Sequence, residues 1–302
     1  MINRCLSLLS TLLSALLSTF YYLLLSIDEW RKAMKLKDKV VVITGSTRGI
    51  GRAIAWACAQ QGARIIISSR KESAVKETCE TFQKENFKVS GIKANVAVNA
   101  DLIKLLNYAL KTWGQIDVWI NNAGLSAGMR FFDELSDEEI KEIVDVNITG
   151  TMQASRIIIP HFIKQGKGIL INMGGMGSKG EKAPHLTAYA LTKAAVASFT
   201  RNLAEEYKGH PISIHMVIPG MVKTDFYNDI KVSPRLTKDL QRLPYALEAF
   251  SVPIEEVGKS CADIVAQEPG KDTGKTYSLL RGTRLIRGIG LMIWYRLSGK
   301  MK

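Results

Sequence analysis

The chain has 302 residues, of which 46% are hydrophobic and 23% are charged. This composition suits a globular fold with a large core and excludes a disordered chain, and the length allows one large α/β domain or two small ones. The four cysteines form no C-x-x-C pair and no metal-type spacing with the four histidines. We therefore expect reduced thiols in a reducing compartment and no metal site.

The net charge of +13 is unevenly distributed along the chain. Residues 271–302 contain eight lysines and arginines but a single acid, Asp272. This asymmetry calls for an acidic partner surface, which is either lipid or nucleic acid.

The N-terminal segment decides between these two partners. Residues 5–27 contain no charged side chain and are long enough to cross about 30 Å of hydrocarbon. We predict a transmembrane anchor over residues 1–30, because a cleaved signal peptide has a shorter apolar core and a small-residue cleavage site. Five basic residues follow the segment and only Arg4 precedes it, so the main domain is expected on the cytoplasmic side of the membrane. We expect no nucleic-acid partner.

From residue 39 onward, strand-like and helix-like segments alternate. Strands are predicted at 39–44, 63–68, 87–92, 116–120, 168–173, 212–217 and 274–279, and helices near 50–61, 71–85, 100–113, 136–165, 187–208 and 255–267. The alternation predicts one α/β domain at residues 36–280, doubly wound around a parallel sheet. Residues 221–253 interrupt the rhythm with three prolines, and an irregular insertion at such a place is typical of a substrate lid.

The first predicted strand ends in a glycine-spaced turn, Gly45-x-x-x-Gly49-x-Gly51, which leads into a helical pattern. Strand, glycine turn and helix in this order are typical of a nucleotide-binding Rossmann domain. Gly45 allows the tight turn, Gly49 lets backbone N–H groups approach a pyrophosphate, and Gly51 lets the helix pack closely. The positive end of the helix dipole then stabilises the bound anion.

The end of the second strand indicates which cofactor binds. An NAD enzyme usually has an acid there to hold the ribose hydroxyls, but this strand ends in Ser69-Arg70-Lys71. Arg70 and Arg48, which lies within the glycine turn, would suit the 2′-phosphate of NADPH, because guanidinium groups match phosphate geometry. The alternative is an ordinary solvated pair of surface arginines.

A tyrosine and a lysine four residues apart, Tyr189 and Lys193, share one face of a predicted helix. A phenol has a pKa near 10, so it acts at neutral pH only when its anion is stabilised, which an ammonium group one turn away can do. Tyr-x-x-x-Lys occurs by chance on many helices. Its weight here comes from the motifs that accompany it, which are Asn121-Asn122-Ala123-Gly124, Asn147 in Asp-Val-Asn-Ile, and Pro219-Gly220-Met-Val-Lys-Thr224.

In order and spacing, these motifs resemble those of the short-chain dehydrogenase/reductase (SDR) family over about residues 36–280. The resemblance implies a Rossmann fold, a nicotinamide cofactor and hydride transfer to or from a carbonyl, and we expect a homo-oligomer. It implies that Tyr189 donates the proton, that Lys193 lowers the pKa of Tyr189 and holds the ribose, and that Asn147 helps to hold a proton-relaying water. The cofactor contacts expected on these grounds are Gly45, Thr47, Arg48, Gly49, Ile50, Gly51, Arg70, Asn95, Val96, Asn122, Ala123, Gly124, Tyr189, Lys193, Pro219, Gly220 and Thr224.

The catalytic serine of the family is missing from this chain. Gly174 and Gly175 stand where the usual serine pair would be, and Ser178 lies only eleven residues before Tyr189. Losing one donor to a developing oxyanion typically costs a few kcal/mol of barrier. Ser178 is the candidate replacement, and the alternatives are a water molecule or a substrate that needs less polarisation.

The same stretch, Asn172-Met173-Gly174-Gly175-Met176-Gly177-Ser178, resembles the chlorophyll b reductase branch of the family, in which Asp takes the place of Gly174. That resemblance implies reduction by NADPH of a formyl group on a large, planar, membrane-borne ring. The glycines would either form a wall that admits a flat substrate or serve only close backbone packing. We therefore expect an NADPH-dependent reductase of a lipophilic carbonyl. The alternatives are a membrane-anchored keto-lipid, sterol or retinoid dehydrogenase/reductase, and a catalytically weak nucleotide-binding scaffold.

Residues 281–302 form a basic tail with an amphipathic pattern. On a helix, Leu285, Ile289, Met292 and Ile293 would lie along one side, with arginines toward the flanks. This pattern is typical of a segment that lies in a membrane interface. The alternative is a tail whose apolar residues pack on the domain or on a second subunit.

Overall fold

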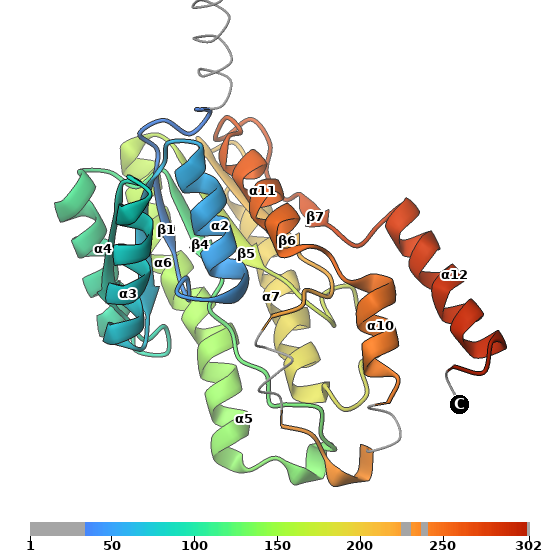
Figure 1. Cartoon of the computed structure of the whole chain (residues 1–302). Helices are drawn as coiled ribbons and strands as arrows, with labels where there is room; N and C mark the ends of the chain where they lie inside the picture. The colour runs from blue at the N-terminus through green and yellow to red at the C-terminus, as the bar shows by residue number, and fades with distance from the viewer. Residues whose placement is uncertain (1–33, 225–230, 237–240, 301–302) are drawn as a thin grey trace, which may run out of the picture.

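A seven-stranded parallel sheet forms the centre of the computed structural model, which describes residues 34–224, 231–236 and 241–300. The strands follow the order β3-β2-β1-β4-β5-β6-β7 across the sheet (Figure 1). They are β1 (Val40–Ile43), β2 (Arg64–Ser69), β3 (Val89–Lys93), β4 (Val118–Asn121), β5 (Gly168–Met173), β6 (Ile212–Ile218) and β7 (Thr276–Ser278). This is the order of a doubly wound Rossmann fold, and it confirms the predicted α/β class.

Helices cover both faces of this sheet. One face carries α2 (Gly49–Gln60), α3 (Glu72–Lys84) and α11 (Ile254–Val265), and the other carries α4 (Asn99–Trp113), α6 (Gly150–Gln165) and α7 (Thr187–Glu206). In β1, Val41 and Ile43 pack toward the first group, whereas Val42 packs toward the second. Parallel strands buried on both faces are continuous apolar runs, as in β1, whose four residues are all buried, whereas the edge strands β3 and β7 are only partly buried.

The stretch predicted as one helix at residues 136–165 forms three consecutive elements. α5 (Asp137–Val144) is followed by a π-helical turn, η2 (Asp145–Thr149), and then by α6. A π-helical turn changes the phase of the side chains that follow it, and such turns are frequent at functional sites. Here the turn carries Asn147, one of the predicted catalytic residues.

The insertion at residues 221–253 is attached to the loop that follows β4. Its described parts contain η3 (Pro234–Leu236) and α10 (Leu243–Phe250), and the loop contains η1 (Phe132–Glu134). The backbone of Met129 accepts a hydrogen bond from Ser233 N at 2.9 Å and donates one to Lys231 O at 2.9 Å. Lys231 and Ser233 of the insertion thus lie beside the loop that leads from β4 to α5.

The C-terminal tail is described by the structure up to residue 300, whereas the first 33 residues are not. The predicted anchor at residues 1–30 lies outside the described residues. Across residues 34–224, 231–236 and 241–300, no helix has both the length and the apolar character needed to cross a membrane. The basic tail forms α12 (Thr283–Leu297), which extends away from the sheet and contacts α10 (Figure 1).

Candidate functional site

The glycine turn lies at the carboxyl end of β1, with its backbone pressed against the end of β4. Gly45 has a φ of +63°, and a Cβ atom placed on it would lie 2.9 Å from Ala123 Cα. A Cβ atom on Gly51 would lie 2.4 Å from both Asn122 Nδ2 and Gly45 O. Neither position therefore tolerates a side chain, which fits the roles predicted for the tight turn and the close helix packing.

Among the described residues, Gly49 has more space beside it than Gly45 or Gly51. Its φ is +55°, and the described atoms within 4 Å of a Cβ atom there belong to Thr224, at 3.7 Å or more. α2 begins here, and the side chain of Arg48, the residue before it, makes no capping hydrogen bond to its first turn. A helix N-terminus behind a glycine turn fits the pyrophosphate of a dinucleotide. The structure also brings Thr224 to this turn from 175 residues further along the chain.

Thr44 joins the ends of β1 and β4, a role that the sequence analysis did not assign. Its Oγ1 accepts hydrogen bonds from Asn122 N and Ala123 N, both at 3.0 Å. In return, Asn122 Nδ2 donates to the carbonyl oxygens of Thr44 and Gly45, both at 3.0 Å. This reciprocal contact fixes the glycine turn against the end of β4. The only signal in the sequence was a hydroxyl residue directly before Gly45.

The residues predicted for the adenosine end lie near one another at the ends of β2 and β3. Val96 is buried, and its carbonyl oxygen would lie 2.8 Å from a Cβ atom on Gly150 at the start of α6. Asn95 Oδ1 accepts a hydrogen bond from Ala97 N at 3.2 Å, which shapes the turn after β3. Arg48 is exposed directly before α2.

Arg70 forms an ion pair that the sequence did not reveal. Its Nη1 lies 2.8 Å from Glu142 Oε1 of α5, and both side chains are about half exposed. Exposed ion pairs contribute roughly 0–1 kcal/mol, so this guanidinium can exchange its carboxylate for a phosphate at low cost. Glu142 nevertheless brings a negative charge to the place where the 2′-phosphate is expected.

Tyr189 and Lys193 lie on α7, as the spacing predicted. Lys193 Nζ lies 5.7 Å from the centre of the Tyr189 ring and donates a hydrogen bond to Met173 O at 2.9 Å. The lysine is only 6% exposed. Burial lowers the pKa of Lys193 to about 8, so the ammonium form still dominates at neutral pH. A buried cation beside a phenol is the arrangement that stabilises a phenolate.

Asn147 is held rigidly beside this pair. Its Oδ1 accepts from Leu125 N at 2.8 Å, and its Nδ2 donates to Leu125 O and to Thr192 Oγ1, both at 2.9 Å. Thr192 Oγ1 in turn donates to Tyr189 O at 2.7 Å. A Cβ atom on Gly124 would lie 3.4 Å from Asn147 Oδ1 and 3.6 Å from Lys193 Nζ, so the end of β4, η2 and α7 converge. Thr192 is a positioning residue that the sequence analysis missed, although it lies one residue before Lys193.

Protein atoms occupy the space beside the two glycines that replace the serine pair. A Cβ atom on Gly174 would lie 2.9 Å from both Ile218 Cγ1 and Ser178 Oγ, and one on Gly175 would lie 2.3 Å from Tyr189 Oη. These contacts favour close backbone packing, one of the two alternatives that the sequence had left open.

Ser178 is buried and its hydroxyl contacts backbone groups. Its Oγ accepts a hydrogen bond from Gly175 N at 3.0 Å and lies 3.4 Å from Lys193 O, to which it donates. Only 5% of the residue is exposed. This position favours a role in holding the turn after β5, and a catalytic role for Ser178 stays a prediction that the structure does not test.

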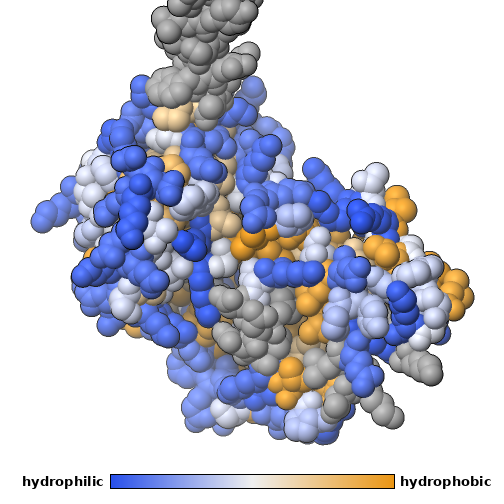
Figure 2. Space-filling model, viewed as in Figure 1, coloured by the Kyte–Doolittle hydropathy of each residue, from blue (hydrophilic) through white to orange (hydrophobic). Residues whose placement is uncertain are grey.

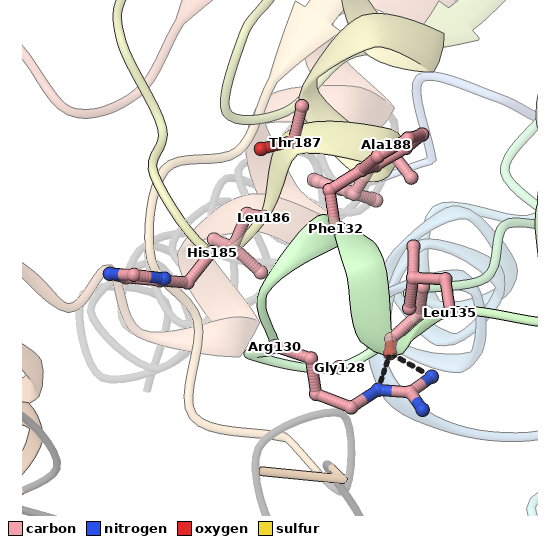
Figure 3. A pocket seen from close by; sticks show the side chains of 10 residues that line it. Gly128, Arg130, Phe132, Leu135, His185, Leu186, Thr187 and Ala188 are labelled. Atoms are coloured by element: carbon pink, nitrogen blue, oxygen red, sulfur yellow. Dashed lines mark hydrogen bonds between the residues drawn. The ribbon is translucent and has the colours of Figure 1, made fainter. Parts of the chain in front are cut away.

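A small pocket lies against Tyr189, between the loop after β4 and the start of α7 (Figure 3). Most of its wall is apolar, with Ala127, Phe132, Leu135, Leu186 and Ala188 among the lining residues. Arg130 also belongs to the wall, but its Nε and Nη2 both donate to Ala127 O, at 2.9 and 2.7 Å. The loop backbone thus fixes the position of the Arg130 guanidinium group.

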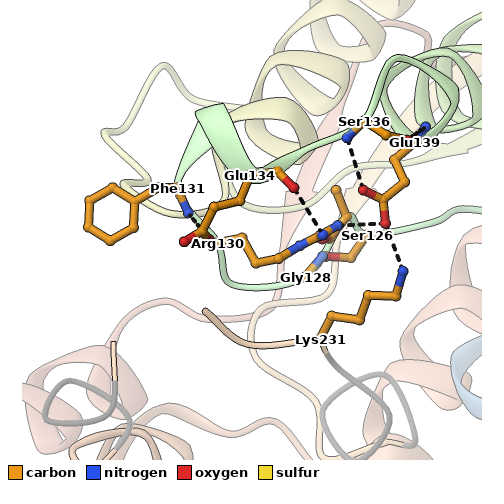
Figure 4. Close-up of polar contacts among 9 residues, drawn as sticks. Ser126, Gly128, Arg130, Phe131, Glu134, Ser136, Glu139 and Lys231 are labelled. Atoms are coloured by element: carbon orange, nitrogen blue, oxygen red, sulfur yellow. Dashed lines mark hydrogen bonds and ion pairs between the residues drawn. The ribbon is translucent and has the colours of Figure 1, made fainter. Parts of the chain in front are cut away.

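A cluster of polar contacts fixes the rim of this pocket (Figure 4). Glu139 Oε1 lies 2.8 Å from Arg130 Nη2 and 2.7 Å from Lys231 Nζ, and these contacts lower the pKa of Glu139 to about 2. Glu139 also closes a capping box with Ser136 at the start of α5. The Glu139 carboxylate on α5 therefore contacts both the loop after β4, through Arg130, and the insertion, through Lys231.

Comparison with known proteins agrees with this geometry. Residues 39–233 match the profile of the family described as short chain dehydrogenase. A probable chloroplastic chlorophyll(ide) b reductase of Oryza sativa is 35% identical over 63% of this chain, but the match spans only 42% of the rice protein. The dehydrogenase/reductase SDR family member 4 of Sus scrofa is 31% identical, covering 82% of this chain and 88% of the pig protein.

Among solved structures, the 3-ketoacyl-(acyl-carrier-protein) reductase of Brucella melitensis complexed with NADH superposes with a TM-score of 0.69. It is 22% identical, and the match covers 80% of this chain and 97% of that one, which shows the shared fold. The family profile alone spans more than half of the chain. The chain therefore belongs to the short-chain dehydrogenase/reductase family and is an oxidoreductase of that family.

Proposed function

We propose that this protein is a membrane-attached, NADPH-dependent reductase that acts on the carbonyl group of a lipophilic substrate. The observation that carries the proposal is the convergence of Tyr189, buried Lys193 and rigidly held Asn147 beside an apolar pocket. A formyl group on a large planar ring is the substrate that we favour.

The protein residues have distinct tasks in such a reaction. NADPH, when bound, supplies the hydride that reduces the carbonyl carbon. Tyr189 Oη donates its proton to the carbonyl oxygen, and the ammonium group of Lys193 stabilises the phenolate that remains. Asn147 holds the backbone of Leu125, and through the hydroxyl of Thr192 it holds the carbonyl of Tyr189 in the first turn of α7.

The arrangement around Gly175 supports an aldehyde substrate in preference to a ketone. Gly174 and Gly175 have no hydroxyl, and Ser178 Oγ contacts backbone groups. Polarisation of the carbonyl then rests on Tyr189. Because an aldehyde carbon is more electrophilic than a ketone carbon, it needs less help from a second donor. The resemblance of residues 172–178 to the chlorophyll b reductase branch, and the 35% identity to a probable chlorophyll(ide) b reductase, support the same substrate class.

The preference for NADPH is supported by Arg48 and Arg70, which flank the cofactor turn at the ends of β1 and β2. No acid stands at the end of β2, where Ser69 is followed by Arg70 and Lys71, to hold the ribose hydroxyls. The apolar lining of the small pocket beside Tyr189 supports an apolar group next to the reacting carbonyl. The uncharged segment at residues 5–27 supports attachment to a membrane in which such a substrate would dissolve.

The test is a panel of carbonyl compounds supplied to membranes that contain the protein. The panel holds a formyl-bearing planar tetrapyrrole, a long-chain aldehyde, a keto-steroid and a small water-soluble aldehyde, each with NADPH or NADH. We expect oxidation of NADPH to be fastest with the lipophilic aldehydes. Turnover of the keto-steroid alone would favour the keto-lipid alternative. No turnover with tight NADPH binding would indicate a scaffold and contradict the proposal.

A further inference from the structure

Within the described part of the chain, α12 packs on the domain through one face. A Cβ atom on Gly288 would lie 2.4 Å from Phe250 Cδ1, so the two helices α12 and α10 touch at this glycine. Tyr295 is 3% exposed and its ring lies 4.8 Å from that of Tyr245. Arg284 adds a two-pronged contact to Glu256 at the start of α11, at 2.8 and 2.7 Å. These contacts fix the rotation of the helix about its own axis.

The opposite face of α12 is apolar and exposed. At about 100° per residue, Ile286, Ile289, Ile293 and Leu297 fall within a stripe about 80° wide, on the side away from Gly288 and Tyr295. We call these four residues the α12 ridge. Their exposed fractions are 70%, 48%, 54% and 82% in that order. Figure 2 shows apolar side chains along the edge of the molecule where α12 lies in Figure 1.

The exposed apolar face of α12 includes different residues from those predicted from the sequence. Met292, expected to lie with Ile289, is half-buried, whereas Ile286 and Leu297 are the most exposed members of the ridge. The ridge runs for about 17 Å along the helix. A soluble domain rarely leaves such a stripe uncovered unless something binds to it.

The charges beside the ridge indicate what binds. Arg287 and Arg296 flank it on its two sides, and Lys300 Nζ lies 4.6 Å from the centre of the Trp294 ring. Trp294 is half exposed on the same flank as Arg287. No acidic residue occurs after Asp272 in the sequence. An apolar stripe flanked by arginines on a helix without acidic residues, with a tryptophan at its edge, matches an anionic bilayer surface, where acyl chains lie below negative headgroups.

We propose that the α12 ridge docks on an anionic lipid surface, with the helix axis parallel to the membrane plane and Arg287 and Arg296 at the level of the headgroups. This contact is separate from the predicted anchor at residues 1–30 and does not depend on the proposed reaction. A second copy of the chain is a poorer partner. Pairing two ridges would bring Arg287 and Arg296 of both copies together with no acid on either helix to neutralise them.

The test uses the full chain in vesicles and a readout local to α12, because the N-terminal segment could itself attach the protein. Trp294 fluorescence is quenched by brominated acyl chains only if the indole enters the bilayer. Subtracting the quenching of a Trp294→Phe variant from that of the wild type isolates this residue. The vesicles are phosphatidylcholine alone or phosphatidylcholine with phosphatidylglycerol.

Two variants alter the surface and each has a matched control. Ile286→Ser with Ile293→Ser removes the centre of the ridge, and Ile103→Ser with Ile163→Ser changes two exposed isoleucines on α4 and α6. Arg287→Gln with Arg296→Gln removes the flanking charges, and Arg156→Gln with Arg201→Gln changes two exposed arginines on α6 and α7. Circular dichroism and cofactor binding verify that each variant is folded.

We expect Trp294 to be quenched at least twofold more in anionic than in zwitterionic vesicles. The ridge variant should lose this quenching, the arginine variant should lose its dependence on anionic lipid, and both controls should behave as the wild type. Absence of Trp294 quenching in anionic vesicles, or equal quenching in the ridge variant, would overturn the proposal. So would protection of α12 from hydrogen exchange that rises with protein concentration without lipid, which would assign the ridge to a second copy.

Discussion

The hydroxyl oxygen of Tyr189 occupies the space in which a side chain on Gly175 would begin. A Cβ atom on Gly175 would lie 2.3 Å from Tyr189 Oη and 3.1 Å from its Cζ. The glycine at this position and the placement of the tyrosine are therefore coupled. Restoring the serine that most of the family carries would displace Tyr189 and would not simply add a donor.

Gly175→Ser should accordingly lower kcat/KM for carbonyl reduction by at least tenfold, because the new Cβ displaces the proton donor from Lys193. NADPH binding should change little, since the glycine turn lies elsewhere. A double-mutant cycle with Tyr189→Phe measures the coupling in the free energy of unfolding. The Gly175→Ser change should destabilise the Phe variant less than the wild type. A rise in kcat/KM would instead show that the serine fits and that the chain merely lacks it.

Lys193 should make the stability of the protein depend on alkaline pH. Its pKa is about 8 in the folded protein because of burial, against about 10.5 for an exposed lysine. Between these two pH values the unfolded chain binds more protons than the folded one, so the free energy of unfolding rises with pH, by up to about 3 kcal/mol. Lys193→Met should abolish this rise while also abolishing turnover. The exposed Lys111→Met is the control, and a rise of equal size in both variants would refute the assignment.

Glu142 should weaken the preference for NADPH. Its carboxylate pairs with Arg70 at 2.8 Å and would stand close to the expected 2′-phosphate. Glu142→Gln frees the guanidinium and removes a negative charge, so the ratio of the NADH to the NADPH dissociation constant should increase several-fold. Arg70→Ala should decrease it, and Arg48→Ala should do so as well. Glu138→Gln on the same helix is the control. If Arg70→Ala leaves the ratio of dissociation constants unchanged, Arg70 does not bind the 2′-phosphate of NADPH.

His215 should lower stability at acidic pH. It is fully buried on β6 beside Tyr277, and neither ring nitrogen has a hydrogen-bond partner among the described residues. Burial lowers the pKa of His215 to about 4, so protons favour the unfolded chain as the pH falls from 6.5 toward 4. Urea titrations should show a loss of about 2 kcal/mol between pH 7 and pH 5 that is absent in His215→Leu. His210→Leu, on the surface, should keep the loss.

The sheet and the cofactor turn were predictable because their causes are local. Parallel strands buried on both faces must be apolar throughout, as in Val40–Ile43, and a left-handed φ at Gly45 demands glycine. The contacts that give Arg70 and Ser178 their present roles were not predictable. Glu142 lies 72 residues from Arg70 along the chain, and the approach of Ser178 Oγ to Gly175 N depends on how the turn after β5 closes.

The π-helical turn and the orientation of α12 could not be predicted, for a different reason. The π-helical turn at Asp145–Thr149 could not be predicted, because five residues are too short a stretch for the shift in helical phase to stand out from the surrounding pattern. On α12 both faces are apolar, so periodicity alone could not say which one meets α10. Gly288, where Phe250 packs, decided it.

Turnover of NADPH by membranes that contain the wild type or the Tyr189→Phe variant tests the central claim most directly, with the carbonyl substrate that the panel identifies. The substitution removes the proton donor but leaves the ring and α7 in place. We predict that kcat falls by at least about a hundredfold while the NADPH dissociation constant changes by less than about twofold. Near-normal turnover in the Tyr189→Phe variant would contradict the claim that this site reduces carbonyls through Tyr189.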